Sequence, residues 1–563
     1  MRLFAAVFLA FLLLPAPARA LTPAEQAVAA HGMVASREAE ATRIGVAVLR
    51  QGGNAVDAAV AVGFALAVTL PVAGNLGGGG FMLVHDAKSG ETVAIDYRET
   101  APAAAHRDMF LDAAGEADAE KSRQSHHAVG VPGTVAGLVA AQQRYGTWPL
   151  DRLLAPAIRL AEDGIVVGAP LAEALRAARE RLARSAAGKA IFLKPDGAPL
   201  AEGERLVQAD LAWSLRRIAE RGAAAFYQGA IAERLIADMA AHGGPMRRGD
   251  LESYRAIVRP PLRGRYRGLE IASMPPPSSG GVHLLQMLNV LAHFPIPEMA
   301  PLGPERAHLL AEAMKRAYAD RAEHLGDPAF WPVPARGLLS PRYAETIAAN
   351  IDRGRARPSA DIRPGAPAAY ESDQTAHFAV MDGAGNAVSN TYTLNFAFGS
   401  GIVAAGTGIL LNNEMDDFSA KPGAPNAYGL VGGEANAVAA GKRPLSSMTP
   451  VIVFKDGRPW LATGARGGGR IITAVLQQLV NLVDLKLDLA TATSLPRLHH
   501  QWLPDRLYLE PGFPAATQAR LRSLGHTLAE TREIGSLNAV MRLDNGFAGI
   551  ADPRRPGGLA MGH

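Results

Sequence analysis

The segment Glu371-Ser372-Asp373-Gln374-Thr375-Ala376-His377 is a polar stretch that runs directly into a hairpin pattern. If the chain is cut between Gln374 and Thr375, one residue gains both a hydroxyl nucleophile and a free α-amine. An α-amine titrates at roughly 7.7 to 8.0, so near neutral pH it can take the proton from the hydroxyl of its own residue. Thr375 is therefore a candidate nucleophile, although a threonine here also suits the start of a strand.

Two strand-like runs follow, at 377–381 and 387–393, separated by a five-residue loop with two glycines. This spacing predicts a β-hairpin. With Ala384 at the loop centre, the predicted register places Thr375 opposite Thr393. Cross-strand partners have Cβ atoms about 4.5 to 5.5 Å apart, so one hydroxyl can hydrogen-bond the other. A slip of one residue would turn these side chains to the other face of the sheet.

Helical patterns dominate before this segment and strand patterns dominate after it. The predicted helices before it are 39–51, 55–69, 150–163, 209–221 and 304–325, with strands at 81–85 and 92–96 and a surface linker at 353–369. After it we predict two more hairpins, turning at 455–457 and 544–546, and helices at 471–483 and 489–493. Sheets with helices packed outside them indicate a layered α/β architecture.

The first twenty residues have the features of a secretory signal peptide. Arg2 supplies a positive start, residues 3–14 are apolar, and Ala18-Arg19-Ala20 is a small-x-small cleavage site. Twelve apolar residues are too few to cross a bilayer, and no later segment is a convincing span. We therefore expect a periplasmic or secreted protein without a membrane span.

Composition excludes several classes of protein. The chain has no cysteine, which rules out disulfides, thiol nucleophiles and thiolate metal sites. Its formal net charge of +4 over 563 residues does not suggest a nucleic-acid partner. The adjacent pairs His126-His127 and His499-His500 are poorly placed to share one ion, and the chain has no His-Glu-x-x-His motif. We expect neither a catalytic metal nor another cofactor.

Glycine-rich runs occur at 75–81 and 463–470. The second run joins a predicted strand to a predicted helix, where free backbone amides can bind an anion and serve as an oxyanion hole. A flexible connector is the alternative interpretation of this run. The first run precedes a strand, so we expect it to allow close backbone packing.

Three polar groups stand beside apolar segments: Arg98 at a strand end, the acidic stretch 412–417, and Ser446-Ser447. Carboxylates can bind an ammonium group, whereas arginine and hydroxyls can bind a carboxylate. Together these groups would fit an amino-acid headgroup. Taken separately, each is more often a turn, a cap or a solvated face.

Several long motifs resemble, in the same order, those of the γ-glutamyltranspeptidases, exported members of the N-terminal-nucleophile hydrolases. The similarity covers essentially the whole chain after the signal. The motifs are Gly52-Gly-Asn-Ala-Val-Asp-Ala-Ala59, Gly74-Asn-Leu-Gly-Gly-Gly-Gly-Phe81, Asp96-Tyr97-Arg98-Glu99, Leu411-Asn-Asn-Glu-Met-Asp-Asp-Phe418 and Arg443-Pro-Leu-Ser-Ser-Met448.

The resemblance implies a four-layer αββα sandwich, made from one precursor that cleaves itself before Thr375. After removal of the signal at 1–20, residues 21–374 would form a large subunit and 375–563 a small catalytic subunit, intertwined in one domain. Thr375 would take a γ-glutamyl group from glutathione or a related amide. It would pass that group to water, an amino acid or a peptide.

The resemblance also assigns roles residue by residue. Thr393 would support the Thr375 hydroxyl, and Gly467 and Gly468 would bind the oxyanion. The α-carboxylate of the donor would be bound by Arg98, Ser446 and Ser447. Its α-amine would be bound by Asn395, Glu414 and Asp417. Tyr428 would belong to a lid loop that covers the bound glutamyl group.

The sequence departs from the family pattern at two of these regions. Ala376 stands where many members have a second threonine, and Arg466 stands where a proline often precedes the glycine pair. Neither change removes a required group. Glu414 is one of two residue types that the family uses there, the other being glutamine.

Two other functions remain open from the sequence. The first is a cephalosporin acylase of the same fold that acts on glutaryl side chains. A glutaryl group has no α-amine, so the presence of Asn395, Glu414 and Asp417 favours a γ-glutamyl donor. The second is a non-catalytic exported protein that binds small amino acids.

Overall fold

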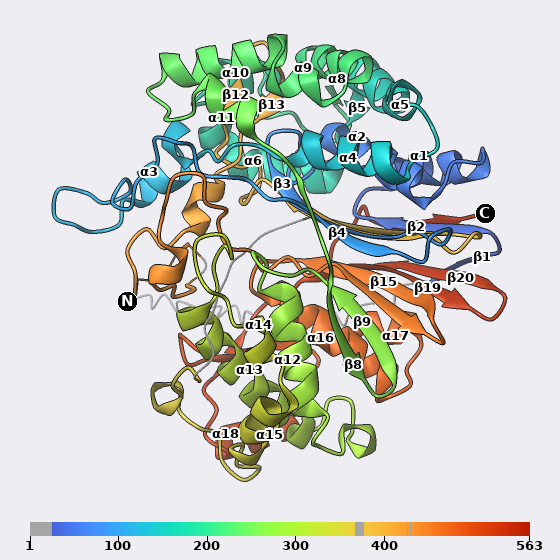
Figure 1. Cartoon of the computed structure of the whole chain (residues 1–563), viewed down its shortest axis with the longest axis vertical. Helices are drawn as coiled ribbons and strands as arrows, with labels where there is room; N and C mark the ends of the chain where they lie inside the picture. Colours follow the sequence, from blue (N-terminus) through green and yellow to red (C-terminus); the bar gives the residue numbers. More distant parts are fainter. Residues whose placement is uncertain (1–24, 366–375, 425, 428) are drawn as a thin grey trace, which may run out of the picture.

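The computed structural model describes residues 25–365, 376–424, 426–427 and 429–563. Thr375 and Tyr428 lie outside the described residues, as does the predicted signal peptide. The centre of the described chain consists of two antiparallel sheets of seven strands each (Figure 1). Helices cover the outer face of each sheet, so the four layers are the expected αββα sandwich.

The first sheet contains, in spatial order, β1 (Ala27–Ala29), β20 (Gly546–Ala551), β19 (Ser536–Leu543), β15 (Arg458–Arg466), β14 (Val451–Lys455), β9 (Leu269–Ser273) and β8 (Leu262–Tyr266). The second contains β21 (Leu559–Gly562), β2 (Gly32–Ser36), β10 (Ala376–Asp382), β11 (Ala387–Thr393), β3 (Gly79–His85), β4 (Thr92–Tyr97) and β7 (Ile257–Arg259). Both sheets combine strands that precede residue 366 with strands that follow residue 375. Neither part of the chain forms either of these two seven-stranded sheets by itself.

The alternation of side chains along β10 shows how the layers are held together. Phe378 and Val380 point to the helices on the outer face, whereas Ala379 and Met381 join the core between the two sheets. This period of two is that of a strand buried on both faces.

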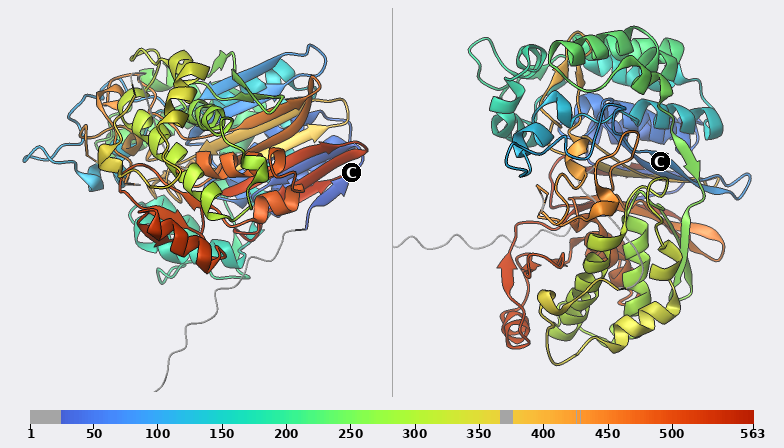
Figure 2. Two further views of the ribbon diagram at one scale, coloured as in Figure 1. Left: turned by 90° about the horizontal axis from the view of Figure 1, so that it is seen from below. Right: turned by 60° about the vertical axis from the view of Figure 1, so that its left-hand side comes forward.

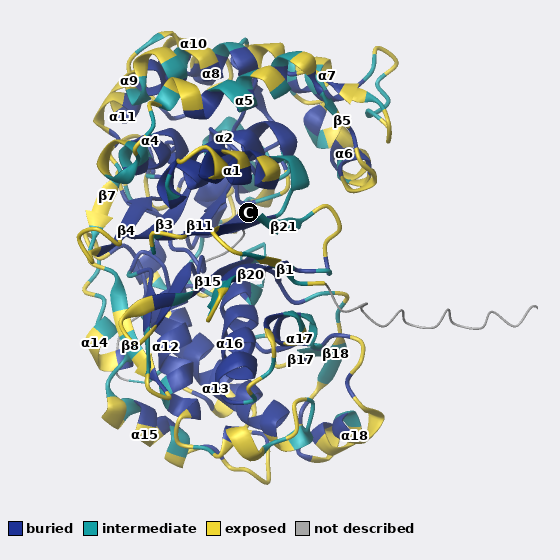
Figure 3. Ribbon diagram, turned by 90° about the vertical axis from the view of Figure 1, so that its right-hand side faces the viewer, coloured by how far each residue is buried: buried dark blue, intermediate teal, exposed yellow. Residues whose placement is uncertain are grey.

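Helices pack on the outer face of each sheet (Figures 1 and 2). Those on the β10 sheet include α1 (Ala39–Arg50), α2 (Ala55–Thr69), α4 (Thr134–Tyr145), α5 (Leu150–Asp163) and α8 (Ala209–Arg221). Those on the β15 sheet include α12 (Gly280–Leu291), α13 (Pro304–His324) and α16 (Arg470–Val483). Figure 3 shows that α2, α12 and α16 are almost wholly buried, whereas α15 (Pro341–Ala349) and α18 (Ala515–Ser523) expose one side.

Residues 55–69 are mostly apolar but too few to cross a membrane, and in the structure they form helix α2. Every one of its residues is buried, because it lies between the sheet and outer helices such as α5. A helix that is apolar on all sides is expected in such a position. Asn54 and Asp57 begin it with a reciprocal capping box. Among the described residues, no helix has the length and apolar character needed to cross a membrane.

The predicted helices and hairpins are present, and three helices have the predicted bounds: α2, α5 and α8. The prediction that residues 25–350 contain strands only near 81–85 and 92–96 was wrong, because β2, β7, β8 and β9 also lie there. Strand β8 exposes Arg263 and Arg265 and turns Leu262 and Tyr266 inward, and this alternation was readable in the sequence. The predicted surface linker is mostly exposed as far as residue 365, where its description ends.

Candidate functional site

Strands β10 and β11 form the predicted hairpin in the predicted register, from Ala376 opposite Tyr392 to Met381 opposite Ala387. The proposed pairing of Thr375 with Thr393 extends this register by one step, onto a residue outside the described ones. Thr393 itself ends β11 and is buried. Its hydroxyl oxygen accepts a hydrogen bond of 2.8 Å from the backbone N–H of Asn395. The hydroxyl hydrogen therefore remains available for another acceptor.

The first glycine run packs tightly behind Thr393, as expected. A Cβ added to Gly78 would lie 1.8 Å from the carbonyl oxygen of Thr393. That carbonyl also accepts a 2.9 Å hydrogen bond from Nδ2 of Asn75, whose Oδ1 accepts from Gly78 N at 3.0 Å. The backbone of Thr393 is thus fixed by groups that leave no room for a side chain.

We therefore expect Gly78→Ala to destabilise the protein by about 3 kcal/mol, because the added methyl group must push the Thr393 backbone away. Thermal unfolding would measure the change. Gly249→Ala is a suitable control, since a Cβ there meets nothing within 4 Å. Equal melting temperatures for the two variants would contradict the tight fit at Thr393.

A short polar connection joins the end of β11 to the acidic turn η4 (Glu414–Asp417). Asn395 adopts a left-handed backbone conformation, with φ of 71°, and its Nδ2 donates to the carbonyl of Asn413 at 3.0 Å. The side chain of Asn413 in turn accepts a hydrogen bond of 3.1 Å from the backbone N–H of Phe396, the residue after Asn395. The structure therefore brings Asn395 beside the turn that carries Glu414 and Asp417.

Arg98 follows β4 and is completely buried among carboxylates. Its Nη1 donates to Glu414 and its Nη2 donates to Asp417, while Oε2 of Glu99 lies 3.6 Å from Nη1. Its Nε and Nη2 also donate to the carbonyls of Pro444 at 3.0 Å and Leu445 at 3.1 Å. Three buried carboxylates thus face one guanidinium group.

This imbalance changes the proton affinity of the acids. Burial raises the pKa of Glu99 to about 7 and raises the pKa of Glu414 well above its usual range, although Arg98 acts in the opposite direction on both. Oε2 of Glu414 and both oxygens of Glu99 have no hydrogen-bond partner among the described residues. The cluster is therefore suited to receive a further cation that also donates hydrogen bonds.

Ser446 and Ser447 lie beside Arg98, on the segment whose preceding carbonyls bind its guanidinium group. The Ser446 hydroxyl accepts from Met448 N at 3.1 Å, and the Ser447 hydroxyl accepts from Nη2 of Arg321 at 2.9 Å. Both residues are buried. Arg98 thus contacts Glu414, Asp417 and the backbone of the segment that leads into Ser446 and Ser447, and Asn395 contacts the backbone of the residue before Glu414. These are the segments that carry the residues assigned by the family resemblance to an amino-acid headgroup: Arg98, Asn395, Glu414, Asp417, Ser446 and Ser447.

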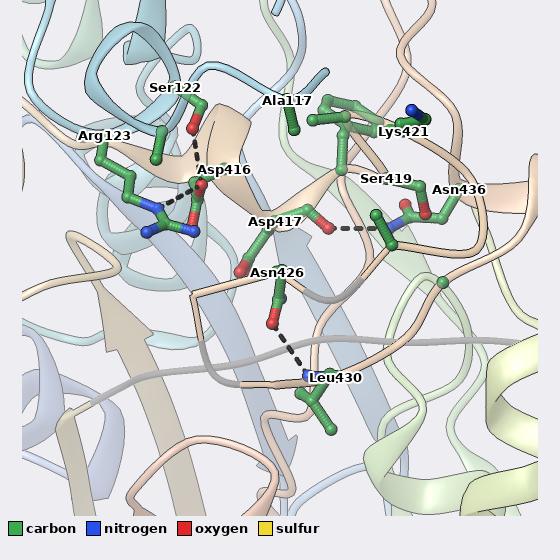
Figure 4. A pocket seen from close by; sticks show the side chains of 15 residues that line it. Ala117, Ser122, Arg123, Asp416, Asp417, Ser419, Lys421, Asn426, Leu430 and Asn436 are labelled. Carbon is green, nitrogen blue, oxygen red and sulfur yellow. Dashed lines mark hydrogen bonds and ion pairs between the residues drawn. The ribbon is translucent and has the colours of Figure 1, made fainter. Parts of the chain in front are cut away.

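A cavity of about 120 Å³ lies beside Asp417. Figure 4 shows the side chains that line it. Asp416, the preceding residue, also lines this cavity and accepts hydrogen bonds from Ser122 Oγ at 2.8 Å and Arg123 Nε at 3.0 Å. Asn436 donates to the backbone carbonyl of Asp417 at 2.7 Å. Ser122, Arg123 and Asn436 could not be predicted as supporting residues, because they lie in segments without a distinctive motif.

The second glycine run is a defined turn between β15 and α16. Gly467 has φ of 126° and Gly468 has φ of 70°, which are conformations that favour glycine. A Cβ on Gly467 would also lie 2.8 Å from Cα of Gly535. Ile471 N donates to the Gly468 carbonyl at 2.7 Å, and the Tyr318 hydroxyl donates to the Gly469 carbonyl. These contacts describe an ordered turn and not a flexible connector.

Arg466 links this turn to the hairpin. It lines a small cavity of about 30 Å³ together with Thr393 and Asn395. In addition, the Ser389 hydroxyl on β11 donates to the Thr463 carbonyl on β15 at 3.0 Å. The glycine turn of one sheet therefore lies close to the end of β11 in the other.

The two histidines of each adjacent pair make different contacts. His126 hydrogen-bonds Asp238 at 3.0 Å, and its neighbour His127 contributes no atom to that contact. His499 bonds Thr473 at 3.0 Å, whereas His500 bonds Asp505 at 3.1 Å.

The family model for gamma-glutamyltranspeptidase matches residues 41–562. The chain belongs to the gamma-glutamyltranspeptidase family. It is therefore an enzyme of the N-terminal-nucleophile hydrolase class, which sets aside a non-catalytic binding protein. The match runs through both sheets and every described residue of the site.

Individual relatives of this gamma-glutamyltranspeptidase-family chain include proteins of two named activities. The glutathione hydrolase proenzyme of Escherichia coli (strain K12) is 54% identical, over 95% of this chain and 92% of its own. The acylase ACY 1 proenzyme of Pseudomonas sp. (strain SE83) is 40% identical, over 91% of this chain and 89% of its own. The crystal structure of a cephalosporin acylase from Bacillus halodurans has a TM-score of 0.86 at 28% identity and covers 99% of both chains.

Proposed function

We propose that this protein is an exported γ-glutamyl transferase and glutathione hydrolase that matures by cutting itself between Gln374 and Thr375. Removal of residues 1–20 and the internal cut would leave subunits of 21–374 and 375–563. Because both sheets contain strands from both parts, the two subunits would remain assembled after the cut. The donor is glutathione or another γ-glutamyl amide, and the acceptor is water, an amino acid or a peptide.

The observation that carries this proposal is the excess of buried carboxylates around Arg98. An α-amino acid headgroup brings an ammonium group, which the carboxylates in excess can bind, and a carboxylate, which Arg98 can bind. Its ammonium group would pair with Asp417 and Glu414 and would donate a hydrogen bond to the side-chain oxygen of Asn395. Its carboxylate would bind Arg98. Arg98 would then exchange part of its contact with the two acids for contact with the ligand.

The hydroxyls of Ser446 and Ser447 would complete the carboxylate site. Each accepts one hydrogen bond in the structure and retains its own hydrogen as a donor. Both lie on the segment that follows the Pro444 and Leu445 carbonyls, which bind Arg98. Tyr428 would belong to the loop that covers the bound glutamyl group.

The chemistry would proceed by acyl transfer. The free amine of Thr375 takes the proton of its own hydroxyl, and the oxygen attacks the γ-carbonyl carbon of the donor. The Gly467 and Gly468 backbone would stabilise the resulting oxyanion, and the Thr393 hydroxyl would hydrogen-bond the nucleophilic oxygen. The leaving amine takes a proton as the C–N bond breaks, which leaves a γ-glutamyl ester on Thr375. Water or an amine acceptor then attacks the carbonyl carbon of this ester and loses a proton, and the Thr375 oxygen leaves and regains its hydrogen.

A comparison of two chromogenic donors would test the assignment against the glutaryl acylase alternative. We expect the purified protein to cleave γ-glutamyl-p-nitroanilide with a kcat/KM about 10³-fold above that for glutaryl-p-nitroanilide, because a glutaryl group leaves the buried acids without their ammonium partner. Equal rates, or a preference for the glutaryl compound, would support the acylase and contradict our proposal.

A further inference from the structure

Two histidines and one aspartate with the side chains of a metal site lie together in the helical layer outside the β10 sheet. They are Asp238 of α10 (Ala230–Ala241), His242 at the end of the same helix, and His126 of the short helix η1 (His126–Ala128). Each offers one ligand atom, and these atoms lie within 4.8 Å of one another. Figure 1 shows α10 at the outer side of this layer, away from both sheets.

Asp238 is a buried carboxylate that no basic side chain neutralises. Its Oδ2 lies 3.0 Å from Nε2 of His126, and its Oδ1 lies 3.9 Å from Nδ1 of His242. Oδ1 also accepts from the Ala405 N–H at 3.4 Å. Among the described residues, no lysine or arginine forms an ion pair with Asp238. Because a buried charge is normally paired or bound to a metal, this carboxylate can accept a further cation.

The local electrostatics favour a cation at this place. Asp238 lies in the last turn of α10, where the negative end of the helix dipole is found. Burial alone would raise the pKa of Asp238, but hydrogen bonds from His126 and the Ala405 N–H lower it below its ordinary value. The carboxylate is therefore ionised near neutral pH, which is the form that binds a metal ion.

The geometry allows coordination once the outer ring has turned. The rings of His126 and His242 are stacked, with centroids 4.5 Å apart and planes 4° apart, so their nitrogen lone pairs run parallel. His242 can leave this stack, because 56% of its side chain is exposed. Its Nδ1 then exchanges a 2.9 Å hydrogen bond to the Asp238 carbonyl for the ion. A tetrahedral Zn²⁺ holds its ligand atoms about 3.3 Å apart, so they need to approach by at most roughly 1.5 Å.

A second group of similar composition is much less suited to a metal ion. His308, Glu312 and His526 also have ligand atoms within 4.8 Å of one another. However, Glu312 is already paired with Lys315 at 2.9 Å and with Arg316 at 2.7 Å, and the two imidazoles hydrogen-bond each other at 2.8 Å. Two cations already neutralise this carboxylate and would repel a metal ion. In the described part of the chain, the cluster on α10 has no such ion pair.

We propose that His126, Asp238 and His242 bind one divalent transition-metal ion of the Zn²⁺ type, with water completing its coordination. Imidazole nitrogen together with carboxylate oxygen is a donor set that Zn²⁺ uses, whereas Mg²⁺ and Ca²⁺ prefer oxygen ligands alone. The chain has no cysteine, so no thiolate competes for the ion. The exposed side of His242 gives the ion a path from solvent.

The position of this site gives the ion a structural role. His126 lies three residues after Arg123, which together with Ser122 binds Asp416 in η4. An ion that ties His126 to α10 therefore stabilises the segment that supports this turn. Since the same carboxylate accepts from Ala405 N, the site also joins residues from both sides of the proposed cut. The inference needs no substrate and is independent of the proposed function.

Calorimetric titration with ZnCl₂ tests the proposal, on purified protein that carries no histidine tag and has been freed of metal with a chelator. We expect the wild type to bind one ion per chain. Asp238→Asn and His242→Gln should each lower the affinity at least tenfold, because each removes one of three protein ligands. His293→Gln removes an exposed histidine outside the cluster and should leave the affinity unchanged. No binding by the wild type, or equal affinity in all four proteins, would overturn the proposal.

Thermal unfolding provides a second measurement. An ion that binds only the folded state raises the melting temperature, by roughly 2 °C for a chain of this length at a Zn²⁺ concentration of 100 times Kd. We expect this rise in the wild type and not in His242→Gln, whose fold should tolerate the change because the side chain is largely exposed. A rise that persists in His242→Gln and disappears in His526→Gln would place the ion at the other cluster and overturn the proposal.

Discussion

Thr375→Ala is expected to remain one uncut chain and to lose γ-glutamyl transfer completely. The hydroxyl of Thr375 would be the nucleophile both for the cut at Gln374 and for the donor, so one substitution removes both reactions. On a denaturing gel, the wild type should give fragments of roughly 39 and 21 kDa, taking about 110 Da per residue and removal of the signal peptide. The variant should give a single band of roughly 60 kDa on the same basis.

Two matched variants separate the chemistry from folding. Thr375→Ser keeps both a hydroxyl and, after the cut, a free amine, so it should still mature and retain some activity. Ala376→Thr restores the residue that many family members carry and should also mature. A Thr375→Ala protein that is cut as fully as the wild type would contradict the assigned nucleophile. So would an uncut wild-type chain that transfers γ-glutamyl groups.

The hairpin at the centre of the β10 sheet could be predicted because its signals are local. A five-residue loop with two glycines fixed the register, and six consecutive pairs follow it, ending at Ala376 opposite Tyr392. The helices with a clear apolar pattern, such as α5, were equally readable. In contrast, β8 and β9 are short strands within a helical region, and β9 joins the sheet by pairing with β14, almost two hundred positions away.

In the site, too, single residues could be predicted from local motifs, but their contacts with distant residues could not. Motifs identified Arg98, Glu414 and Asp417, but no pattern along the chain could show that one guanidinium would contact both acids. That arrangement requires the end of β4 and the turn η4 to meet, across more than three hundred residues of sequence. The residues that hold η4 in place, such as Asn436 and Ser122, were missed for the same reason. Each acts through a single hydrogen bond that has no sequence signature.

Asp417→Asn is expected to lower kcat/KM for γ-glutamyl-p-nitroanilide about 10²- to 10³-fold, because the donor ammonium would lose a buried ionic partner worth about 3 to 5 kcal/mol when broken. The amide is similar in shape to the carboxylate, and Arg98 keeps its contact with Glu414, so the fold should tolerate the change. Glutaryl-p-nitroanilide has no ammonium group and should lose much less. The ratio of kcat/KM for the γ-glutamyl donor to that for the glutaryl donor should therefore fall close to one.

The neighbouring acid supplies the control for this prediction. Asp416 belongs to the same turn and is also buried, but its carboxylate binds Ser122 and Arg123, whereas that of Asp417 binds Arg98. Asp416→Asn should lower the melting temperature, because it weakens a buried charged contact, while the ratio between the two donors stays near its wild-type value. If Asp417→Asn matures normally and keeps the wild-type ratio, the ammonium must bind elsewhere. If both variants lose the same fraction of the ratio, the effect comes from the turn as a whole and not from the charge of Asp417.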